Sequence, residues 1–355
     1  MSTILVINPG STSTKLALYD LASAEPQERY EESISHDPEE LAHCKVPLDQ
    51  LDLRTRAVQE FLQRRQVEHI DVIAARGGLV RPIKAGSYAV NERMIEDLTH
   101  NRYGSHVSNL GALIANRLGE ELGCPSLIAD PVGVDEFEPL ARYSGLPELQ
   151  RRCQSHALNI RATARRAASD LGSSMEKLRL VMVHLGGGIS IAPLLYGRII
   201  DVNNAHDGGP FSPQRCGTLP TTQLVDLAFS GKYKSASELK SYLTKRAGLL
   251  AYLGTDDGRE IAERIAGGDA RAAEVYEAMA YQIAKEIGAM ATVLKGQVDA
   301  IVLTGGLARP PLSDWIAERT GWIAPLKLYP GEHELRALAE AGSRYLTGQE
   351  SLQEY

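Results

Sequence analysis

Apolar and polar positions alternate at the start of the chain in the pattern of a β-hairpin. A short apolar run at Ile4–Asn8 and an alternating run at Lys15–Asp20 flank a polar turn at Pro9–Thr14. Downstream, apolar runs of strand length alternate with segments of helical spacing. The predicted strands are Asp71–Ala75 and Ser126–Ala129, and the predicted helices are Leu48–Val67 and Asn109–Leu122. The pattern predicts an α/β half.

The opening pattern recurs in the second half of the chain. A strand at Arg179–His184, a turn at Gly186–Gly188 and a strand at Ile189–Leu194 repeat the hairpin, so we expect two equivalent lobes. Two such turns could hold a polyphosphate from both sides. Further predicted elements are the strands Arg198–Val202 and Ala300–Leu303 and the helices Asn159–Leu171, Thr221–Ser230, Ser235–Arg246, Ala270–Leu294 and His333–Leu346. We expect Arg161, Arg165 and Arg166 to form a solvated helix face.

Length and composition agree with two lobes. A chain of 355 residues is longer than one hydrophobic core usually supports. Apolar residues make up 43%, charged residues 23%, and the net charge is -7, which favours a globular protein and argues against nucleic-acid binding. No basic leader or long apolar run occurs, so we expect a cytoplasmic protein without a membrane segment. The scattered cysteines, Cys44, Cys124, Cys153 and Cys216, are expected to be free and buried.

Three turns have the composition of phosphate-binding or nucleotide-binding loops. The turn from Asn8 to Lys15 offers backbone N–H groups, hydroxyls and an ammonium, although an ordinary polar hairpin tip has the same composition. It is not a Walker A loop, because Lys15 begins a strand. In the second turn, Gly186–Gly188 let a ligand approach the backbone, and the strand that follows excludes a dinucleotide fingerprint. The third, Thr304–Gly306, follows a strand and suits adenosine.

Two arginines and one aspartate are candidates for anion and metal chemistry. Arg76 leaves a predicted strand beside apolar residues, which suits a carboxylate with a hydrocarbon tail, whereas a surface arginine is the alternative. Arg215 lies in a proline-bounded loop and could stabilise a transferring phosphoryl group. Asp130 follows a strand, where it could face Mg²⁺ or simply start a turn.

Taken in order, these segments resemble the acetate and butyrate kinases of the acetokinase family, within the actin, sugar kinase and Hsp70 ATPase-fold superfamily. The resemblance spans nearly the whole chain and is closer to the butyrate kinases. It is carried by Ile7–Lys15, Arg76–Leu79, His106–Gly111, His156–Asn159, Val202–Ala205 and Gly209–Pro213. Acetate kinases usually carry Asn where this chain has Gly187 and Glu where it has Arg309.

The resemblance implies a fold of two similar actin-like ATPase (ribonuclease H-like) lobes with an ATP cleft between them. The implied lobes are residues 1–165 plus 331–355, on the acid side, and residues 166–330, which bind the nucleotide. Its implied phosphate ligands are Asn8, Ser11, Ser13, Lys15, His184, Gly186, Gly187 and Gly188, and Gly305 and Gly306 would adjoin adenosine. The implied catalytic residues are Arg76, Asp130, His156 and Arg215, with Asn8 and Asp130 at Mg²⁺.

The implied reaction transfers a phosphoryl group from ATP to butyrate and forms butyryl phosphate and ADP. A carboxylate is already ionised at neutral pH, so positioning and positive charge suffice. The implied partners are a short-chain carboxylic acid and its acyl phosphate, in a homo-oligomer. Alternatives are a kinase of another short or branched acid, such as isobutyrate, propionate or acetate, a sugar or polyol kinase with Asp130 as base, and a non-catalytic ATP switch.

Overall fold

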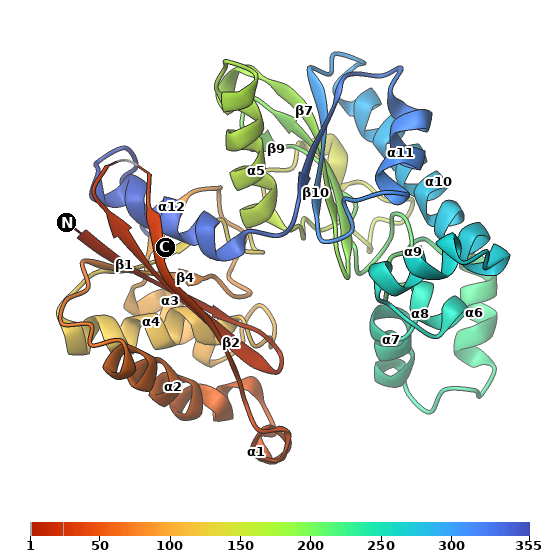
Figure 1. Cartoon of the computed structure of the whole chain (residues 1–355). Coiled ribbons are helices and arrows are strands. Elements are labelled where there is room, and N and C mark those ends of the chain that lie inside the picture. The colour runs from red at the N-terminus through yellow and green to blue at the C-terminus, as the bar shows by residue number, and fades with distance from the viewer. Residues whose placement is uncertain (1, 24) are drawn as a thin grey trace. The chain divides into compact units, whose positions relative to one another are not determined.

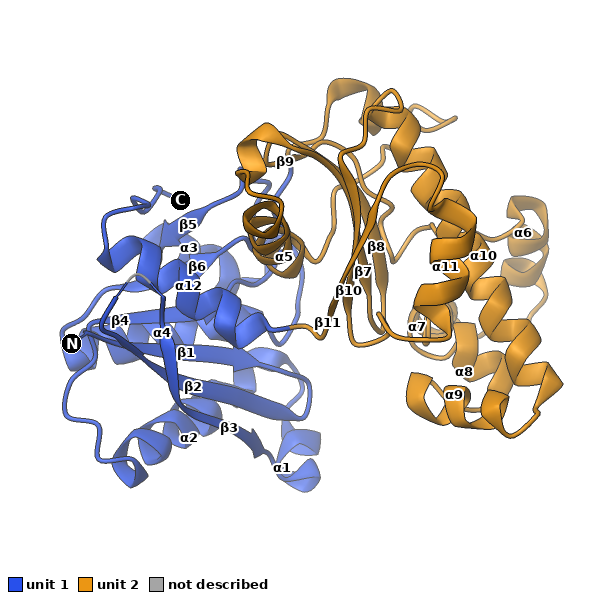
Figure 2. Cartoon of the chain, turned by 45° about the horizontal axis from the view of Figure 1, so that its top comes forward, with its two compact units in different colours: residues 1–135, 333–355 blue, residues 136–332 orange. Residues whose placement is uncertain are grey.

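The computed structural model describes residues 2–23 and 25–355 of the chain (Figure 1). It divides into two compact units, which Figure 2 shows in different colours. Unit 1 contains residues 1–135 and 333–355, and unit 2 contains residues 136–332. Each unit has one β-sheet and its own hydrophobic core.

Unit 1 is built on a six-stranded sheet in the order β3-β2-β1-β4-β6-β5. Its strands are β1 (Ser2–Pro9), β2 (Ser13–Leu21), β3 (Gln27–Ser35), β4 (Val72–Arg76), β5 (Ser87–Ala89) and β6 (Ser126–Ala129). β1, β2 and β3 are antiparallel, which confirms the predicted hairpin, and β4 and β6 continue the sheet parallel to β1. The polar, exposed strand β3 was not predicted, because its alternation is weak in a sequence rich in Glu.

Helices cover both faces of this sheet. They are α1 (Pro38–His43), α2 (Leu51–Arg64), α3 (Glu92–Thr99), α4 (Asn109–Leu122) and α12 (Glu334–Leu346). Asn91 caps α3 by accepting from the amide of Met94, and Gly123, with φ of 69°, ends α4 in the left-handed conformation. α4 packs on β1, β4 and β6, and α12 packs on β1 and β4.

Unit 2 repeats this topology in its own sheet, which has the order β11-β10-β7-β8-β9. Its strands are β7 (Arg179–Leu185), β8 (Ile189–Leu195), β9 (Arg198–Ile199), β10 (Ala300–Gly305) and β11 (Leu326–Pro330). Three antiparallel strands are again followed by two that run parallel to the first. The predicted echo of the first half in the second is therefore confirmed.

Among the described residues, unit 2 has more helices than unit 1, and its longest is α10. They are α5 (Ala157–Asp170), α6 (Thr221–Phe229), α7 (Ala236–Lys245), α8 (Gly248–Leu253), α9 (Gly258–Ala266), α10 (Ala270–Val293) and α11 (Leu312–Thr320). α5 packs on β7 and β10, and α10 packs on β7 and β8. Along the described chain, no helix is long and apolar enough to cross a membrane.

Two helices pack on sheets that the preceding strands do not belong to. α5 follows β6 of unit 1 but packs in unit 2, and α12 follows β11 of unit 2 but packs in unit 1. The units accordingly divide at residues 135/136 and 332/333, whereas the predicted division at residues 165/166 falls inside α5. The sequence pattern alone cannot place these boundaries, because the unit to which α5 or α12 belongs is determined by the sheet on which the helix packs.

The predicted exposure of Arg161 and the predicted burial of three of the four cysteines are wrong. Arg161 is not on a solvated face: it is 9% exposed and donates a hydrogen bond to the carbonyl oxygen of Gly197, since α5 turns this side toward the sheet. The four cysteines are free, as expected, but only Cys153 is buried.

Candidate active site

Three polar residues of unit 1 occupy the carboxyl ends of adjacent parallel strands. Asn8 lies near the end of β1, Arg76 ends β4, and Asp130 follows β6. Their neighbours are paired in register, Ile7 with Ala75 and Arg76 with Ala129. Because neighbouring strands are about 4.8 Å apart, the three residues share one edge of the sheet. Candidates that are distant in sequence are thus brought together within one unit.

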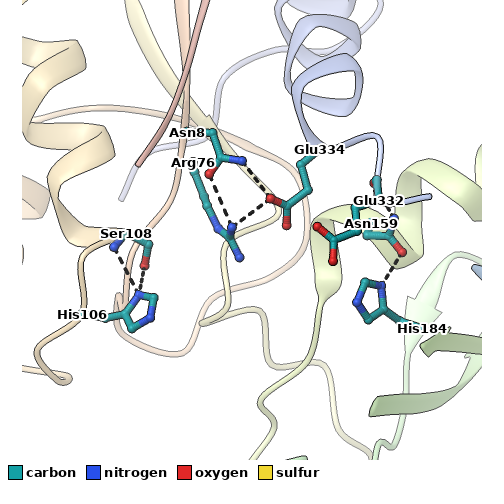
Figure 3. A network of polar contacts seen from close by, with 8 residues as sticks. All are labelled: Asn8, Arg76, His106, Ser108, Asn159, His184, Glu332 and Glu334. Carbon is teal, nitrogen blue, oxygen red and sulfur yellow. Dashed lines mark hydrogen bonds and ion pairs between the residues drawn. The ribbon is translucent and has the colours of Figure 1, made fainter. Parts of the chain in front are cut away.

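Asn8 and Arg76 meet a carboxylate that sequence reasoning missed (Figure 3). Glu334, the first residue of α12, accepts a hydrogen bond of 2.8 Å from Asn8 Nδ2 and another of 2.8 Å from a terminal nitrogen of Arg76. The same Arg76 nitrogen lies 3.4 Å from Asn8 Oδ1. The Nε and second terminal nitrogen of Arg76 donate to nothing in residues 2–23 and 25–355. Arg76 therefore keeps donors for a ligand.

Asp130 is held in a strained and buried position at the same edge. The φ of Asp130 is 38°, and the residue is 2% exposed to solvent. Oδ1 accepts from the amide of Gly86 at 2.8 Å, and the Asp130 amide donates to the Gly86 carbonyl oxygen at 3.0 Å. A non-glycine residue in the left-handed region costs free energy, and such positions cluster at functional sites.

The loop after Arg76 is fixed by a second motif of the chain. Asn109, at the start of α4, accepts from the amide of Leu79 at 2.8 Å and donates to the Gly104 carbonyl oxygen at 2.9 Å. A Cβ at Gly78 would lie 2.4 Å from Asn109 Oδ1, and one at Gly111 would lie 2.3 Å from the Arg76 carbonyl oxygen. The glycines are needed here because α4 and the strand end approach so closely.

The first hairpin presents its polar residues on two faces of the sheet. Lys15 is exposed and pairs with Asn8, so these two side chains share a face. Thr14 is completely buried on the opposite face, since side chains alternate along a strand. At the tip, Ser11 is exposed and Ser13 is partly buried.

In unit 2, a short network fixes the ring of His184 at the end of β7 (Figure 3). Asn159 Nδ2 donates to the Glu332 carbonyl oxygen at 2.6 Å, which turns Asn159 Oδ1 toward His184 Nδ1 at 2.7 Å. An amide oxygen only accepts, so His184 Nδ1 carries a hydrogen. Nε2 is then an acceptor in the neutral ring and a donor in the charged one.

His156 stacks on His184. The ring centroids are 3.9 Å apart with an interplanar angle of 15°, and His156 Nδ1 lies 2.9 Å from Ser190 Oγ. His156 is the residue before α5, and Ser190 pairs with His184 across the hairpin. Two imidazoles in face-to-face contact disfavour a charge on both at once.

The glycine turn between β7 and β8 is packed against the loop of Arg215. Ser212 Oγ donates to the Gly187 carbonyl oxygen at 2.7 Å, and the Ser212 amide donates to the Arg215 carbonyl oxygen at 3.0 Å. A Cβ at Gly188 would lie 2.7 Å from Arg215 Cζ, and one at Gly186 would lie 2.9 Å from His184 Nε2. A Cβ at Gly187 would meet nothing within 4 Å.

The guanidinium of Arg215 has no protein partner among the described residues, neither a hydrogen-bond acceptor nor a carboxylate. Burial lowers its pKa from the ordinary value of an arginine. A partly desolvated cation with five open donors beside a glycine turn is suited to an anion.

The two glycines of the third turn, Gly305 and Gly306, lie in different surroundings. Gly305 ends β10 with φ of 97°, and a Cβ there would lie 2.3 Å from the Leu185 carbonyl oxygen. Gly306 is exposed, and a Cβ there would meet nothing within 4 Å. Gly305 is therefore required by packing against β7, whereas Gly306 leaves backbone open to a ligand.

The duplicated sheet with polar residues at its strand ends defines an actin-like ATPase fold, and solved structures share it. An acetate kinase from Porphyromonas gingivalis matches with a TM-score of 0.79 at 19% identity, over 97% of this chain and 99% of that one. A propionate kinase from Francisella tularensis matches with a TM-score of 0.74 at 18% identity, over 96% of this chain and 99% of that one. At these identities the likeness shows the fold, as predicted.

Sequence comparison identifies the family. The model of the acetokinase family matches residues 147–311. A protein of Caldanaerobacter subterraneus described as probable butyrate kinase 2 is 49% identical over 354 residues, 99% of each chain. A probable butyrate kinase of Listeria monocytogenes is 45% identical over 356 residues, 99% of each chain. The chain belongs to the acetokinase family and is a phosphotransferase with a carboxyl group as acceptor, which confirms the predicted family and enzyme class.

Proposed function

We propose that the protein transfers the γ-phosphoryl group of Mg·ATP to butyrate, and that it also runs the reverse reaction, making ATP from butyryl phosphate. The observation that carries this proposal is that two guanidinium groups, Arg76 and Arg215, keep donors for an anion, in a chain whose full-length relatives are described as probable butyrate kinases. Arg76 is followed by Leu79 and the buried Val80, which suit a short hydrocarbon tail.

The chemistry needs charge and position more than a base. The two free donor sites of Arg76 fit a carboxylate in a bidentate manner. Arg215 would stabilise the charge of the transferring phosphoryl group, and His156 would donate a hydrogen bond to it. The amides of the first hairpin and of Gly186–Gly188, with Lys15 and His184, would hold the ATP phosphates. Gly306 would adjoin adenosine, with Gly305 supporting it.

Magnesium fits the oxygen ligands at the strand ends of unit 1. Mg²⁺ usually takes one or two carboxylates and keeps several waters. Asp130, Asn8 and Glu334 would provide the oxygen atoms that hold the ion. Bound magnesium would neutralise phosphate charge during transfer. We further propose a cytoplasmic homo-oligomer, on the basis of the family resemblance.

The first experiment measures acyl hydroxamate formed by purified protein with Mg·ATP and acetate, propionate, butyrate, isobutyrate or valerate. We expect the highest kcat/KM with butyrate. A maximum at another acid would retain the carboxylate kinase and reject butyrate as the preferred substrate. Absence of acyl phosphate with every acid would reject the proposed reaction.

A second experiment tests the role of Arg76. We expect Arg76→Gln to raise the KM for butyrate at least tenfold, because the loss of a bidentate charged contact costs about 1.5–3 kcal/mol, while the KM for ATP changes little. Arg93→Gln is the control, because it removes an exposed charge from α3 in the same unit. Equal effects on both substrates would reject this role.

A further inference from the structure

A buried arginine lies beneath the first hairpin. Arg54 of α2 is 0% exposed, whereas Arg56 and Arg64 of the same helix are exposed. Its contacts reach across the sequence to the turn between β1 and β2, on the face of the sheet that carries Thr14. Arginine is almost never completely buried without a carboxylate.

All five N–H donors of Arg54 are used, and every acceptor is neutral. One terminal nitrogen donates to the Ser13 carbonyl oxygen at 2.8 Å and to Thr14 Oγ1 at 2.9 Å. The other donates to the Ser11 carbonyl oxygen at 3.2 Å and to Gln50 Oε1 at 2.9 Å, and Nε donates to Gln50 Oε1 at 3.0 Å. Throughout the described chain, no carboxylate lies within 4.0 Å of this guanidinium.

The N–H donors of Arg54 are therefore all paired, but its acceptors are neutral and leave the positive charge without a counter-charge among the described residues. Burial lowers the pKa of Arg54 to about 10, so the group is still a cation at neutral pH. Removing an ion from water is strongly unfavourable, and neutral acceptors offset this cost only in part. Within residues 2–23 and 25–355 no carboxylate contacts this cation, and two of its hydrogen bonds lead to the carbonyl oxygens of Ser11 and Ser13 at the hairpin tip.

Arg54 also determines how the turn faces solvent. Arg54 donates hydrogen bonds to the carbonyl oxygens of Ser11 and Ser13, and the His36 amide donates to the Thr12 carbonyl oxygen at 3.0 Å. The amides of Ser11 and Thr12 donate to no acceptor in the part of the chain that the structure describes. Carbonyls are thus turned inward and N–H groups are left for an external acceptor, the arrangement of an anion-binding nest. In unit 2, Ser212 holds the Gly187 carbonyl oxygen in a comparable way.

We infer that Arg54 is a positioning residue for the nucleotide phosphates: it holds the turn carbonyls away from the ligand, and its charge is neutralised when phosphate binds to the turn. This inference rests on the proposed function and adds a residue that does not touch the substrate. A buried charge is weakly screened, so it acts on a phosphate across the thickness of the turn.

The test compares Arg54→Gln, Arg54→Lys and the control Arg56→Gln by titration calorimetry with Mg·ATP, tripolyphosphate and adenosine. We expect Arg54→Gln to lower affinity for ATP and tripolyphosphate about tenfold or more and to leave adenosine within twofold. Arg54→Lys keeps the charge and three donors for the hairpin oxygens, so its affinity for ATP should stay within about threefold of wild type. Arg56→Gln should resemble wild type, because a solvated charge is screened.

Three outcomes would overturn the inference. One is an ATP affinity of Arg54→Gln equal to that of Arg56→Gln, and another is an equal loss for adenosine and tripolyphosphate. If Arg54→Gln does not fold, the Lys variant decides alone, and a loss of tenfold or more there rejects the electrostatic role. Formation of acyl phosphate by the wild type would keep the proposed function in each case, and failure of the wild type to bind ATP would reject both.

Discussion

Adjacent glycines at the end of β10 provide a direct test of the packing described for unit 2. Gly305 has φ of 97°, and a Cβ there would lie 2.3 Å from the Leu185 carbonyl oxygen, a backbone atom that cannot rotate away. Gly306 has open space around the same position. Gly305→Ala and Gly306→Ala therefore make the same chemical change in opposite surroundings.

The expected cost for Gly305→Ala combines two effects. A non-glycine residue in a disfavoured region of φ costs about 1–3 kcal/mol. Displacing β10 from β7 to relieve the overlap adds about 1–3 kcal/mol, the usual cost of overpacking. We expect about 4 kcal/mol in the free energy of unfolding, and a fall of about 8–16 °C in the Tm of the transition that unfolds unit 2.

Differential scanning calorimetry of both variants would measure this difference, with circular dichroism to confirm the folded state. Gly306→Ala should remain within about 0.5 kcal/mol of wild type in stability, as is usual for a substitution without new contacts. If Gly306 adjoins adenosine as proposed, this variant raises the KM for ATP without lowering Tm. A Gly305→Ala protein within about 1 kcal/mol of wild type would refute the argument from φ and the Leu185 contact.

Two further predictions concern histidines. Asn159→Ala removes the acceptor that fixes the proton on His184 Nδ1. We therefore expect the ¹⁵N chemical shifts of the His184 ring to show the Nε2–H tautomer, and kcat to fall about tenfold or more. An unchanged tautomer would reject this role of Asn159. Burial, followed by the charge of Arg54, lowers the pKa of His36 from 6.5, so the unfolded chain binds the proton more readily. Stability should therefore fall as the pH decreases below about 6.5, and His36→Gln should flatten this dependence in denaturant titrations at several pH values; an unchanged slope would contradict the assignment.

Local patterns predicted the elements best where one face is apolar over several residues. α4 and β6 have the bounds expected from the sequence, and the two hairpins lie where the alternation places them. Elements with weak apolar patterns were missed, among them β3 and the short β5. β9 is shorter than expected, because the residues after Ile199 leave the sheet.

The candidate residues were recognisable from sequence because each lies in a short motif that ends a strand. Asn8, Arg76 and Asp130 could be named individually, but their common edge follows from the parallel pairing of β1, β4 and β6. No short motif indicates Glu334, since its contact with Asn8 depends on α12 packing on the first sheet.

By itself, the sequence determined the strand and helix periods, the duplicated hairpin, the glycine turns and the family. The tertiary structure alone decided which helix covers which sheet, and so placed Arg161 and Arg54 in buried positions and Glu334 beside Arg76. The physical reason is that periodicity reports which face of a segment is apolar, whereas the partner of that face is selected by packing between residues far apart in the chain.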